Sequence, residues 1–233
     1  MTQNTIFPLK QHSLVPIAGH SQKFPINRIF CVGRNYMAHA AEMGISIDKS
    51  TQQPFYFLKD SSTYVPSGSK IQYPCKTQNY HHEIELVLAI GRAGKNIQAK
   101  DAFEYIYGYG CGLDMTRRDI QLKARDEGKP WDFGKNFPES AVMSELVRAE
   151  DIHVDVNQVD ITLTVNGKTV QHSNTQHFIW NIGEIIEDLS SYYELQPGDL
   201  IFTGTPEGVG PVVPGDLLEG AVAGIANIKL EIC

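Results

Sequence analysis

The segment NYHHEIELVLAI, residues 79–90, most constrains the fold, because it combines a buried strand with two carboxylates. Apolar residues from Ile84 to Ile90 are typical of a buried strand, whereas Glu83 and Glu85 lie in its opening half. Side chains at i and i+2 of a strand point to the same face, so the two carboxylates start roughly 7 Å apart and can converge at their tips. Because an unpaired buried charge is costly, a cation or solvent is expected between them.

The composition describes a globular protein without a strong electrostatic attraction to polyanions. The chain has 233 residues, of which 42% are hydrophobic and 20% charged, so it can enclose a large core. A net charge of -7 argues against nucleic acid or an anionic membrane as the main partner. A local basic pocket could still attract a small acid.

The cysteines and the chain start indicate a cytoplasmic protein. Cys31, Cys75, Cys111 and Cys233 are far apart and form no CxxC pair, which suggests neither a zinc cluster nor a disulfide framework. The first residues lack a continuous apolar stretch, and no run of 18 apolar residues occurs. We therefore expect neither export nor membrane insertion.

Residues 1–28 predict an extended N-terminal arm, because Pro8, Pro16 and Pro25 interrupt any periodicity. The remainder, residues 29–233, is expected to form one domain. Short runs of aromatic and β-branched residues separated by Pro and Gly are typical of strands. No repeat at a fixed period and no low-complexity tract occurs, so the sequence predicts one mixed, mainly β domain.

Two local signals in the second half of the chain have specific structural meanings. Asn166-Gly167 follows an alternating strand pattern and predicts a hairpin turn. Apolar residues at helical spacing follow in the segment 182–189, where Asn181 and Glu184 are placed as a capping box. This helix is expected to pack on a sheet.

Asp114, in GYGCGLDMT, is a third carboxylate that could join the two glutamates. Its flanking glycines permit close backbone approach, and three carboxylates form an oxygen-only ligand set that suits Mg²⁺, Mn²⁺ or Ca²⁺ better than zinc. Such a site leaves coordination positions for water and a chelating substrate. In the alternative interpretation, one glutamate pairs with Arg92 or Lys95 and the other faces solvent.

The segment from about Asn35 to Met43 predicts a helix ended by Gly44, and it carries a candidate catalytic pair. His39 and Glu42 are three residues apart and share one helical face. The carboxylate would orient the imidazole and favour its protonated form, which raises its tendency to take a proton from water. The alternative is a surface pair of small energetic value.

Other polar residues lie in unusually apolar or glycine-rich surroundings. Lys59 and Lys135 could bind a substrate carboxylate or stabilise an oxyanion, or could extend to solvent from a strand edge. One of His81 and His82 can share the face of the glutamates and donate a hydrogen bond to them, without being a metal ligand. TGTPEGVG lacks the ending of a phosphate loop, but its amides and Thr205 could hold a carboxylate.

Five motifs, taken together, resemble the fumarylacetoacetate hydrolase family. They occur in that family's order from about Arg28 to the C-terminus: GRNYMAHAAEMG, HHEIELVLAIG, GLDMTRRDIQ, PWDFGKNF and PGDLIFTGTPEGVG. The resemblance implies a mainly β fold for residues 29–233, a β-sandwich roll with a few short helices, usually dimeric. It also implies Mg²⁺ or Mn²⁺, with Ca²⁺ as a substitute, bound by the residues that match Glu83, Glu85 and Asp114.

The resemblance also implies roles for single residues. The matches to His39 and Glu42 would activate water on a helix that orders as a lid, with Lys135 as the third catalytic residue. Substrate contacts are implied for Arg34, Lys59, Arg118, Gln121 and Thr205. Relatives often have a proline after Lys59, where this chain has Asp60 and Ser61.

The implied reaction is metal-dependent hydrolysis of a carbon–carbon bond in a 2,4-dioxo acid. Within the family, the motifs are most similar to members that cleave fumarylpyruvate to fumarate and pyruvate in gentisate degradation. Cleavage of simple acylpyruvates and decarboxylation of oxaloacetate are the alternatives within the family. A carboxylate-binding or metal-binding protein without turnover is the alternative from another class.

Overall fold

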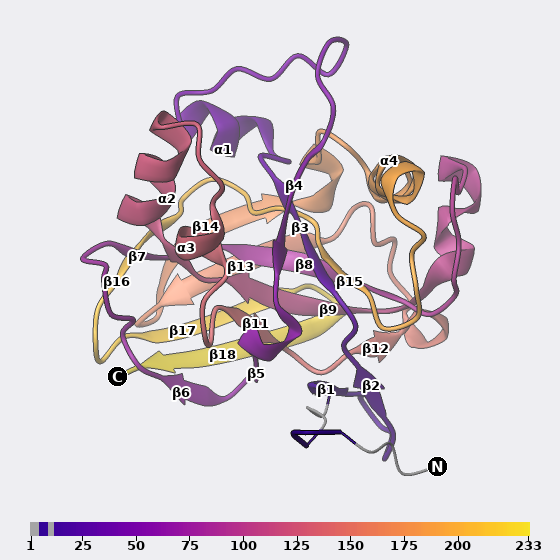
Figure 1. Cartoon of the computed structure of the whole chain (residues 1–233), viewed down its shortest axis with the longest axis horizontal. Coiled ribbons are helices and arrows are strands. Elements are labelled where there is room, and N and C mark those ends of the chain that lie inside the picture. Colours follow the sequence, from indigo (N-terminus) through magenta and orange to yellow (C-terminus); the bar gives the residue numbers. More distant parts are fainter. Residues whose placement is uncertain (1–4, 9–11) are drawn as a thin grey trace.

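The structure is a computed structural model that describes residues 5–8 and 12–233 (Figure 1). Its strands are β1 (Leu14–Pro16), β2 (Lys23–Pro25), β3 (Ile29–Gly33), β4 (Phe55–Lys59), β5 (Tyr64–Pro66), β6 (Ser69–Ile71), β7 (Tyr80–His82), β8 (Ile84–Ile90), β9 (Ile106–Asp114), β10 (Thr116–Arg117), β11 (Ala141–Met143), β12 (Val147–Arg148), β13 (Asp160–Val165), β14 (Lys168–Asn174), β15 (Leu200–Phe202), β16 (Gly210–Val212), β17 (Leu217–Val222) and β18 (Ala226–Ile232). Its α-helices are α1 (Met37–Glu42), α2 (Arg118–Asp126), α3 (Asp132–Lys135) and α4 (Ile182–Tyr192), and its 3-10 helices are η1 (Ser61–Thr63), η2 (Ala99–Tyr105), η3 (Ala149–Asp151) and η4 (Thr175–His177).

Two mixed sheets form the body, which confirms the expected mainly β fold. The larger sheet has the order β4-β3-β15-β8-β9-β11-β5, with β12 paired to β9, and the smaller has the order β14-β13-β17-β18-β6. A third, three-stranded sheet, β10-β7-β16, extends from one end. Figure 1 shows the helices at the margins of these sheets, with α1, α2 and α3 grouped on one side and α4 on another.

Strand β8 crosses the centre of the molecule, and its alternating side chains pack into two different cores. Leu86 and Leu88 belong to the main core, which also contains residues of the smaller sheet such as Leu163. Val87 and Ala89 point to the opposite face, into a second apolar cluster. Every residue of β8 is buried, as the apolar run predicted.

The N-terminal segment forms a two-stranded ribbon on the outer face of the larger sheet. β1 pairs antiparallel with β2, and Val15 and Phe24 are buried in the second apolar cluster. Ile17 then forms a bridge with Leu146. Residues 1–4 and 9–11 of the expected arm lie outside the described residues, and the division at residue 28 stays a prediction.

The hairpin and the capped helix are confirmed. Asn166 and Gly167 have φ values of 51° and 78°, the left-handed conformation that a two-residue turn between β13 and β14 requires. Asn181 Oδ1 accepts from Glu184 N at 3.0 Å, and Glu184 Oε2 accepts from Asn181 N at 2.8 Å. α4 packs beside the larger sheet, where Tyr56 of β4 donates to the Ile185 carbonyl at 3.3 Å. No helix in the described part of the chain is both long and apolar enough to cross a bilayer.

Helix α1 begins two residues later than predicted, because its approach segment is used for tertiary contacts. Arg34 has φ 62°, a left-handed conformation that a helix cannot contain. The Asn35 side chain donates to the carbonyls of Trp180 (3.0 Å) and Thr203 (2.8 Å) and accepts from the Trp180 amide (2.8 Å). These bonds fix the start of α1 beside the end of β15. Gly44, with φ 71°, follows the helix as predicted.

We predict that Asn35→Ala destabilises the fold by about 3 kcal/mol, because it leaves two buried carbonyls and one buried amide unpaired. Chemical denaturation of the metal-free protein would measure the free energy of unfolding. Asn227→Ala is the control, since Asn227 is an exposed residue of β18 and its loss should cost no more than about 0.5 kcal/mol. Equal losses in both variants would contradict this role for Asn35.

Candidate active site

The register of β8 and β9 brings two of the three carboxylates face to face. Ile84 pairs with Leu113, so Glu83 lies directly opposite Asp114, and the Asp114 amide donates to the Glu83 carbonyl at 2.8 Å. Opposed residues of an antiparallel pair have Cβ atoms about 5 Å apart and point to the same face. Glu85, two residues along β8, shares that face.

The expectation that Glu83 lies within one continuous strand is wrong. Glu83 is the junction between β7 and β8, which belong to different sheets. β7 leaves to pair with β10 and β16, while β8 stays between β15 and β9. The carboxylate therefore lies where two sheets separate, which provides space for other side chains to reach it.

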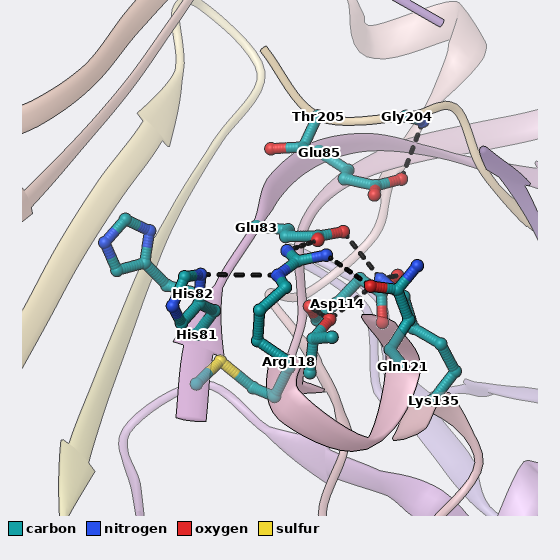
Figure 2. A network of polar contacts seen from close by, with 12 residues as sticks. His81, His82, Glu83, Glu85, Asp114, Arg118, Gln121, Lys135, Gly204 and Thr205 are labelled. Carbon is teal, nitrogen blue, oxygen red and sulfur yellow. Dashed lines mark hydrogen bonds and ion pairs between the residues drawn. The ribbon is translucent and has the colours of Figure 1, made fainter. Parts of the chain in front are cut away.

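Glu83, Glu85 and Asp114 are all buried and can each place one oxygen within 4.8 Å of the others. Figure 2 shows the three carboxylates side by side, Glu85 from β8, Asp114 from the end of β9 and Glu83 from the junction between β7 and β8. A set of three carboxylate oxygens suits a hard divalent cation. The burial matters because three unneutralised anions at this range would repel strongly in a low-dielectric site.

Cationic side chains from three elements neutralise two of these carboxylates. Lys135 Nζ lies 2.7 Å from Glu83 Oε2 and 2.7 Å from Asp114 Oδ2, and Arg118 also donates to Glu83. Lys59 Nζ lies 2.8 Å from Asp114 Oδ1. The alternative pairing of a glutamate with Arg92 is wrong, because Arg92 contacts Glu104 instead.

These ion pairs determine the charge states of the groups concerned. Burial alone would raise the pKa of Glu83, but Lys135 and Arg118 hold it well below its usual range. Burial likewise opposes the charge on Lys135, but Asp114 and Glu83 raise the pKa of its ammonium above the usual value. Lys135 therefore stays charged and bridges two carboxylates at the position where a divalent cation would be attracted.

Glu85 is the carboxylate that this network leaves without a cation. Its hydrogen bond in the described part of the chain comes from the Gly204 amide, 2.7 Å from Oε2. Burial, together with the charges of Asp114 and Glu83, raises the pKa of Glu85 well above its usual range. A buried carboxylate held in this way gains most from a bound cation, so the residues present fit Mg²⁺ or Mn²⁺.

The His39–Glu42 pair adjoins the cavity that Glu83 and Glu85 line, with His39 in the lining and Glu42 exposed. His39 Nδ1 lies 3.2 Å from Glu42 Oε2, and the hydrogen bond from His39 lowers the pKa of Glu42. His39 is only 6% exposed and lines the cavity together with Glu83 and Glu85. With Nδ1–H donating to Glu42, Nε2 is left as a proton acceptor, and the burial of His39 argues against a pair that lies wholly on the surface.

The TGTPEGVG loop supplies amides to protein carboxylates. The Gly204 amide binds Glu85, and the Gly208 amide lies 3.3 Å from both oxygens of Glu42. Gly204 and Gly208 have φ values of 99° and 89°, which only glycine adopts without strain. Thr205 lies between them, lines the cavity, and is hydrogen-bonded to Gln171 Nε2 at 2.9 Å.

The remaining expected substrate contacts do not all line the cavity. Arg34, Arg118 and Gln121 line it, and Arg118 Nη1 donates to Gln121 Oε1 at 3.1 Å. Lys59 lies behind Lys135, where Nζ donates to the Lys135 carbonyl and to Ser140 Oγ at 3.0 Å. It is fully buried, so it does not extend to solvent from a strand edge.

The loop after Lys59 is held by its own hydrogen bonds. The Asp60 amide donates to Asn136 Oδ1 at 2.8 Å, and the Asp60 carboxylate accepts from the Ser62 amide at 2.8 Å. Asp60 thereby caps η1. Asp60 thus connects β4 to the segment that follows α3.

Sequence reasoning missed Gln171, which positions the site from behind. The hydrogen bond expected from His81 or His82 to a glutamate is not found among the described residues, where His82 contacts Gln171 and His81 contacts Asn79 and Arg118. Gln171 of β14 accepts a hydrogen bond from the Ile84 amide (3.2 Å), lies 3.0 Å from His82 Nδ1, and contacts Thr205. His81 Nδ1 accepts from Arg118 Nε at 3.4 Å, and burial together with the Arg118 charge lowers the pKa of His81 to about 4. The only sequence signal for Gln171 is an amide at an inward position of an alternating strand.

Comparison with known proteins places this site in a family. A family model described as fumarylacetoacetate (FAA) hydrolase C-terminal matches residues 28–232. A fumarylpyruvate hydrolase from a Ralstonia species is 56% identical over 190 residues, which are 82% of this chain and 98% of that protein. A mitochondrial oxaloacetate decarboxylase from Dictyostelium discoideum is 39% identical over 199 residues, 85% of this chain and 89% of that protein.

A solved structure agrees over nearly the whole chain. The crystal structure of fumarylpyruvate hydrolase from Pseudomonas aeruginosa in complex with Mn²⁺ and pyruvate superposes with a TM-score of 0.94 at 42% identity. The match covers 98% of this chain and 99% of that chain. The expected fold class is therefore confirmed.

We predict that Glu85→Gln acts in opposite directions on stability and on metal binding. In the metal-free protein, removing a buried carboxylate that lacks a cation should raise the free energy of unfolding by about 1–3 kcal/mol. Mn²⁺ affinity should fall roughly 100-fold or more, because a ligand is lost. Chemical denaturation without metal and calorimetric Mn²⁺ titration measure the two effects, and a variant that kept native Mn²⁺ affinity would exclude Glu85 as a ligand.

We also predict that Mn²⁺ affinity rises with pH. The raised pKa of Glu85 means that the metal-free protein holds a proton there above the usual range for glutamate, and a cation must displace it. Below that raised pKa the affinity should increase by up to about tenfold per pH unit. Calorimetric titrations at several pH values in two buffers of different ionisation enthalpy would detect the released proton, and a flat affinity profile would exclude the coupling.

Proposed function

The chain belongs to the fumarylacetoacetate hydrolase family, and from this premise we propose that it is a metal-dependent hydrolase that cleaves fumarylpyruvate to fumarate and pyruvate. One observation carries the proposal most directly. A buried set of three carboxylates and a His–Glu pair line or adjoin a single cavity, together with cationic groups that can bind a carboxylate. A protein that only bound an acid would not need the proton-accepting pair beside the cation site.

Glu83, Glu85 and Asp114 would hold Mg²⁺ or Mn²⁺. When bound, the metal supplies Lewis-acid polarisation of a 2-oxo acid and electrostatic stabilisation of the negative charge that develops on the pyruvate fragment. Lys135 Nζ contacts the oxygens of Glu83 and Asp114 that would hold the cation, so with those oxygens on a cation Nζ would be free to donate to the substrate.

The proton chemistry is assigned to His39. Glu42 accepts from Nδ1, which leaves Nε2 to remove a proton from water as the oxygen adds to C4 of the dioxo acid. Lys135 donates to the oxyanion that forms there. The C3–C4 bond then breaks, its electron pair stays on C3 as a pyruvate enolate, and a proton delivered to C3 completes the reaction.

The substrate end that carries the 2-oxo acid is assigned to the polar side of the cavity. Arg118 and Gln121 project from α2 into the cavity, and Thr205 faces them from the loop after β15. Arg118 can donate to a carboxylate in the bidentate manner typical of guanidinium groups. Lys59 has an indirect role, because its Nζ donates to the main-chain carbonyl of Lys135 and holds that residue in place.

Oxaloacetate decarboxylation is the second candidate, since a relative of that activity is 39% identical. Loss of carbon dioxide from oxaloacetate also leaves a pyruvate enolate, so the same cation site would serve. Decarboxylation needs no water nucleophile, so it would not depend on His39 as hydrolysis does. Rates on fumarylpyruvate, acetylpyruvate and oxaloacetate would separate the activities.

Several broader features form part of the proposal. We propose a cytoplasmic homodimer that acts in gentisate or related aromatic degradation. Cys31, Cys75, Cys111 and Cys233 are all unpaired, in keeping with a reducing compartment. Phe133 of α3 is 80% exposed and Met37 of α1 is 52% exposed, and apolar side chains of this kind are typical of a surface covered by a second subunit.

We predict that His39→Ala lowers kcat for fumarylpyruvate about 100-fold to 10,000-fold with Mg²⁺ or Mn²⁺ present, because the general base is lost. Mn²⁺ affinity should change little, since His39 is not a proposed ligand. Absorbance of the dioxo acid measures the rate. His172→Ala, at an exposed position of β14, is the control and should keep native kcat. If His39→Ala kept native kcat, another residue would have to activate water.

Removing the metal from the native protein with a chelator should abolish its activity. If the stripped protein kept the native rate, the proposed role of the metal would be wrong.

A further inference from the structure

Arg34 is a partly buried cation that no protein group neutralises. Its Nε is buried without a hydrogen-bond partner, and no hydrogen bond or ion pair joins its side chain to any residue of the described ranges 5–8 and 12–233. Burial lowers the pKa of Arg34, and the nearby charge of Arg125 lowers it further. A guanidinium in a structural role is usually paired, as Arg28 shows by donating to both oxygens of Asp199 (3.0 and 2.5 Å).

Aromatic rings hold the Arg34 guanidinium in place without using its donors. Its central carbon lies 5.5 Å from the ring centroid of Phe55 and 5.5 Å from that of Trp131. These two rings contact each other edge to face at 4.8 Å, and Phe57 lies 5.8 Å from Trp131. Contact through a guanidinium face leaves the edge N–H groups free for a planar acceptor such as a carboxylate.

The backbone at Arg34 also indicates a functional position. Arg34 has φ 62°, a conformation that costs energy for a residue other than glycine. The hydrogen bonds of Asn35 to Trp180 and Thr203 keep the chain in that turn. The side chain is thereby directed from the end of β3 toward the rings of β4 and the segment before α3.

Arg34 lies at the boundary between two connected spaces. The inner cavity, about 30 Å³, is lined by Glu83, Glu85 and His39, and an outer cavity of about 510 Å³ shares part of its lining. Both are lined by Arg34, Phe57, Arg125, Trp131 and Lys135. Because these residues line both cavities, an acyl arm beyond C4 can extend past Arg34 into the outer cavity.

Arg125 adds a second positive charge at this boundary. It projects from α2, and its side chain is 29% exposed while it pairs with the adjacent Asp126 at 2.8 Å. Arg34 and Arg125 therefore line one aromatic-walled passage together with Lys129 and Lys135, and Asp132 is the carboxylate among its lining residues. A planar, conjugated acyl arm that ends in a carboxylate matches both the flat ring walls and the excess of positive charge.

We propose that Arg34, assisted by Arg125, binds the distal carboxylate of the acyl arm and so selects dioxo acids with a second acid group over simple acylpyruvates. The inference rests on the proposed function, because it assigns one end of that substrate. Arg34 is the specificity-determining residue, and the rings of Phe55 and Trp131 position it. Arg118 and Gln121, which line the inner cavity but not the outer one, are left for the 2-oxo acid end.

The test compares Arg34→Met with the native protein on fumarylpyruvate and acetylpyruvate, which lacks the distal carboxylate. The ratio of kcat/KM for fumarylpyruvate to that for acetylpyruvate should fall about 10-fold to 100-fold, because a charge-assisted bidentate contact is lost. Arg34→Lys keeps the charge but not the planar fork, so its ratio should be intermediate. An unchanged ratio, including an equal loss on both substrates, would overturn the proposal.

A matched control and a binding measurement complete the test. Arg92→Met removes an exposed arginine that stacks on Tyr105 at 4.9 Å and lines neither cavity, so it should keep the native ratio. Calorimetric titration of the Mn²⁺-loaded protein with fumarate should show at least a roughly tenfold weaker affinity in Arg34→Met. If the native protein cleaves neither substrate, the proposed function is wrong, and equal fumarate affinity in native and variant protein would then overturn the role of Arg34 as well.

Discussion

The mutual repulsion of three buried carboxylates is the constraint that organises this molecule. The β8–β9 register fixes Glu83 opposite Asp114 and puts Glu85 on the same face. Removing each charge from water costs several kcal/mol unless counter-charges compensate. α2, α3 and β4 therefore meet over this end of the sheets and bring Arg118, Lys135 and Lys59 to the carboxylates, as Figure 2 shows for the first two. The cavity is the space left between these cationic side chains.

The parts of the site that follow local rules could be predicted from the sequence. Glu83 and Glu85 share a face because side chains alternate in extended chain, and His39 and Glu42 meet because three residues make nearly one helical turn. The Asn166-Gly167 turn depends on left-handed φ values that those residue types favour. Each of these inferences needs only a few neighbouring residues, so an unaligned sequence was enough.

The partners of these residues depend on contacts distant in the chain, and sequence alone could not supply them. Glu83 lies at a sheet junction because β7 pairs with β10 and β16, and nothing within HHEIEL marks the separation. Gln171 is 87 residues from the Ile84 amide that it accepts from. Arg34 adopts a left-handed backbone because Asn35 is tied to residues about 145 and 168 positions away. The charge states of such residues can therefore be assigned only once the folded structure shows which groups surround them.

The loop after β15 holds two carboxylates of the site through main-chain amides. The Gly204 amide binds Glu85 of the proposed metal site, and the Gly208 amide binds Glu42 of the proposed catalytic pair. Such donors do not depend on which side chains the loop carries, as long as both glycines keep their backbone conformation. Pro206 and Glu207, between the anchors, can therefore diverge during evolution without disturbing Glu85 or Glu42. Variation at these two positions would change the side chains that the loop carries, while the carboxylates of Glu85 and Glu42 keep their main-chain donors.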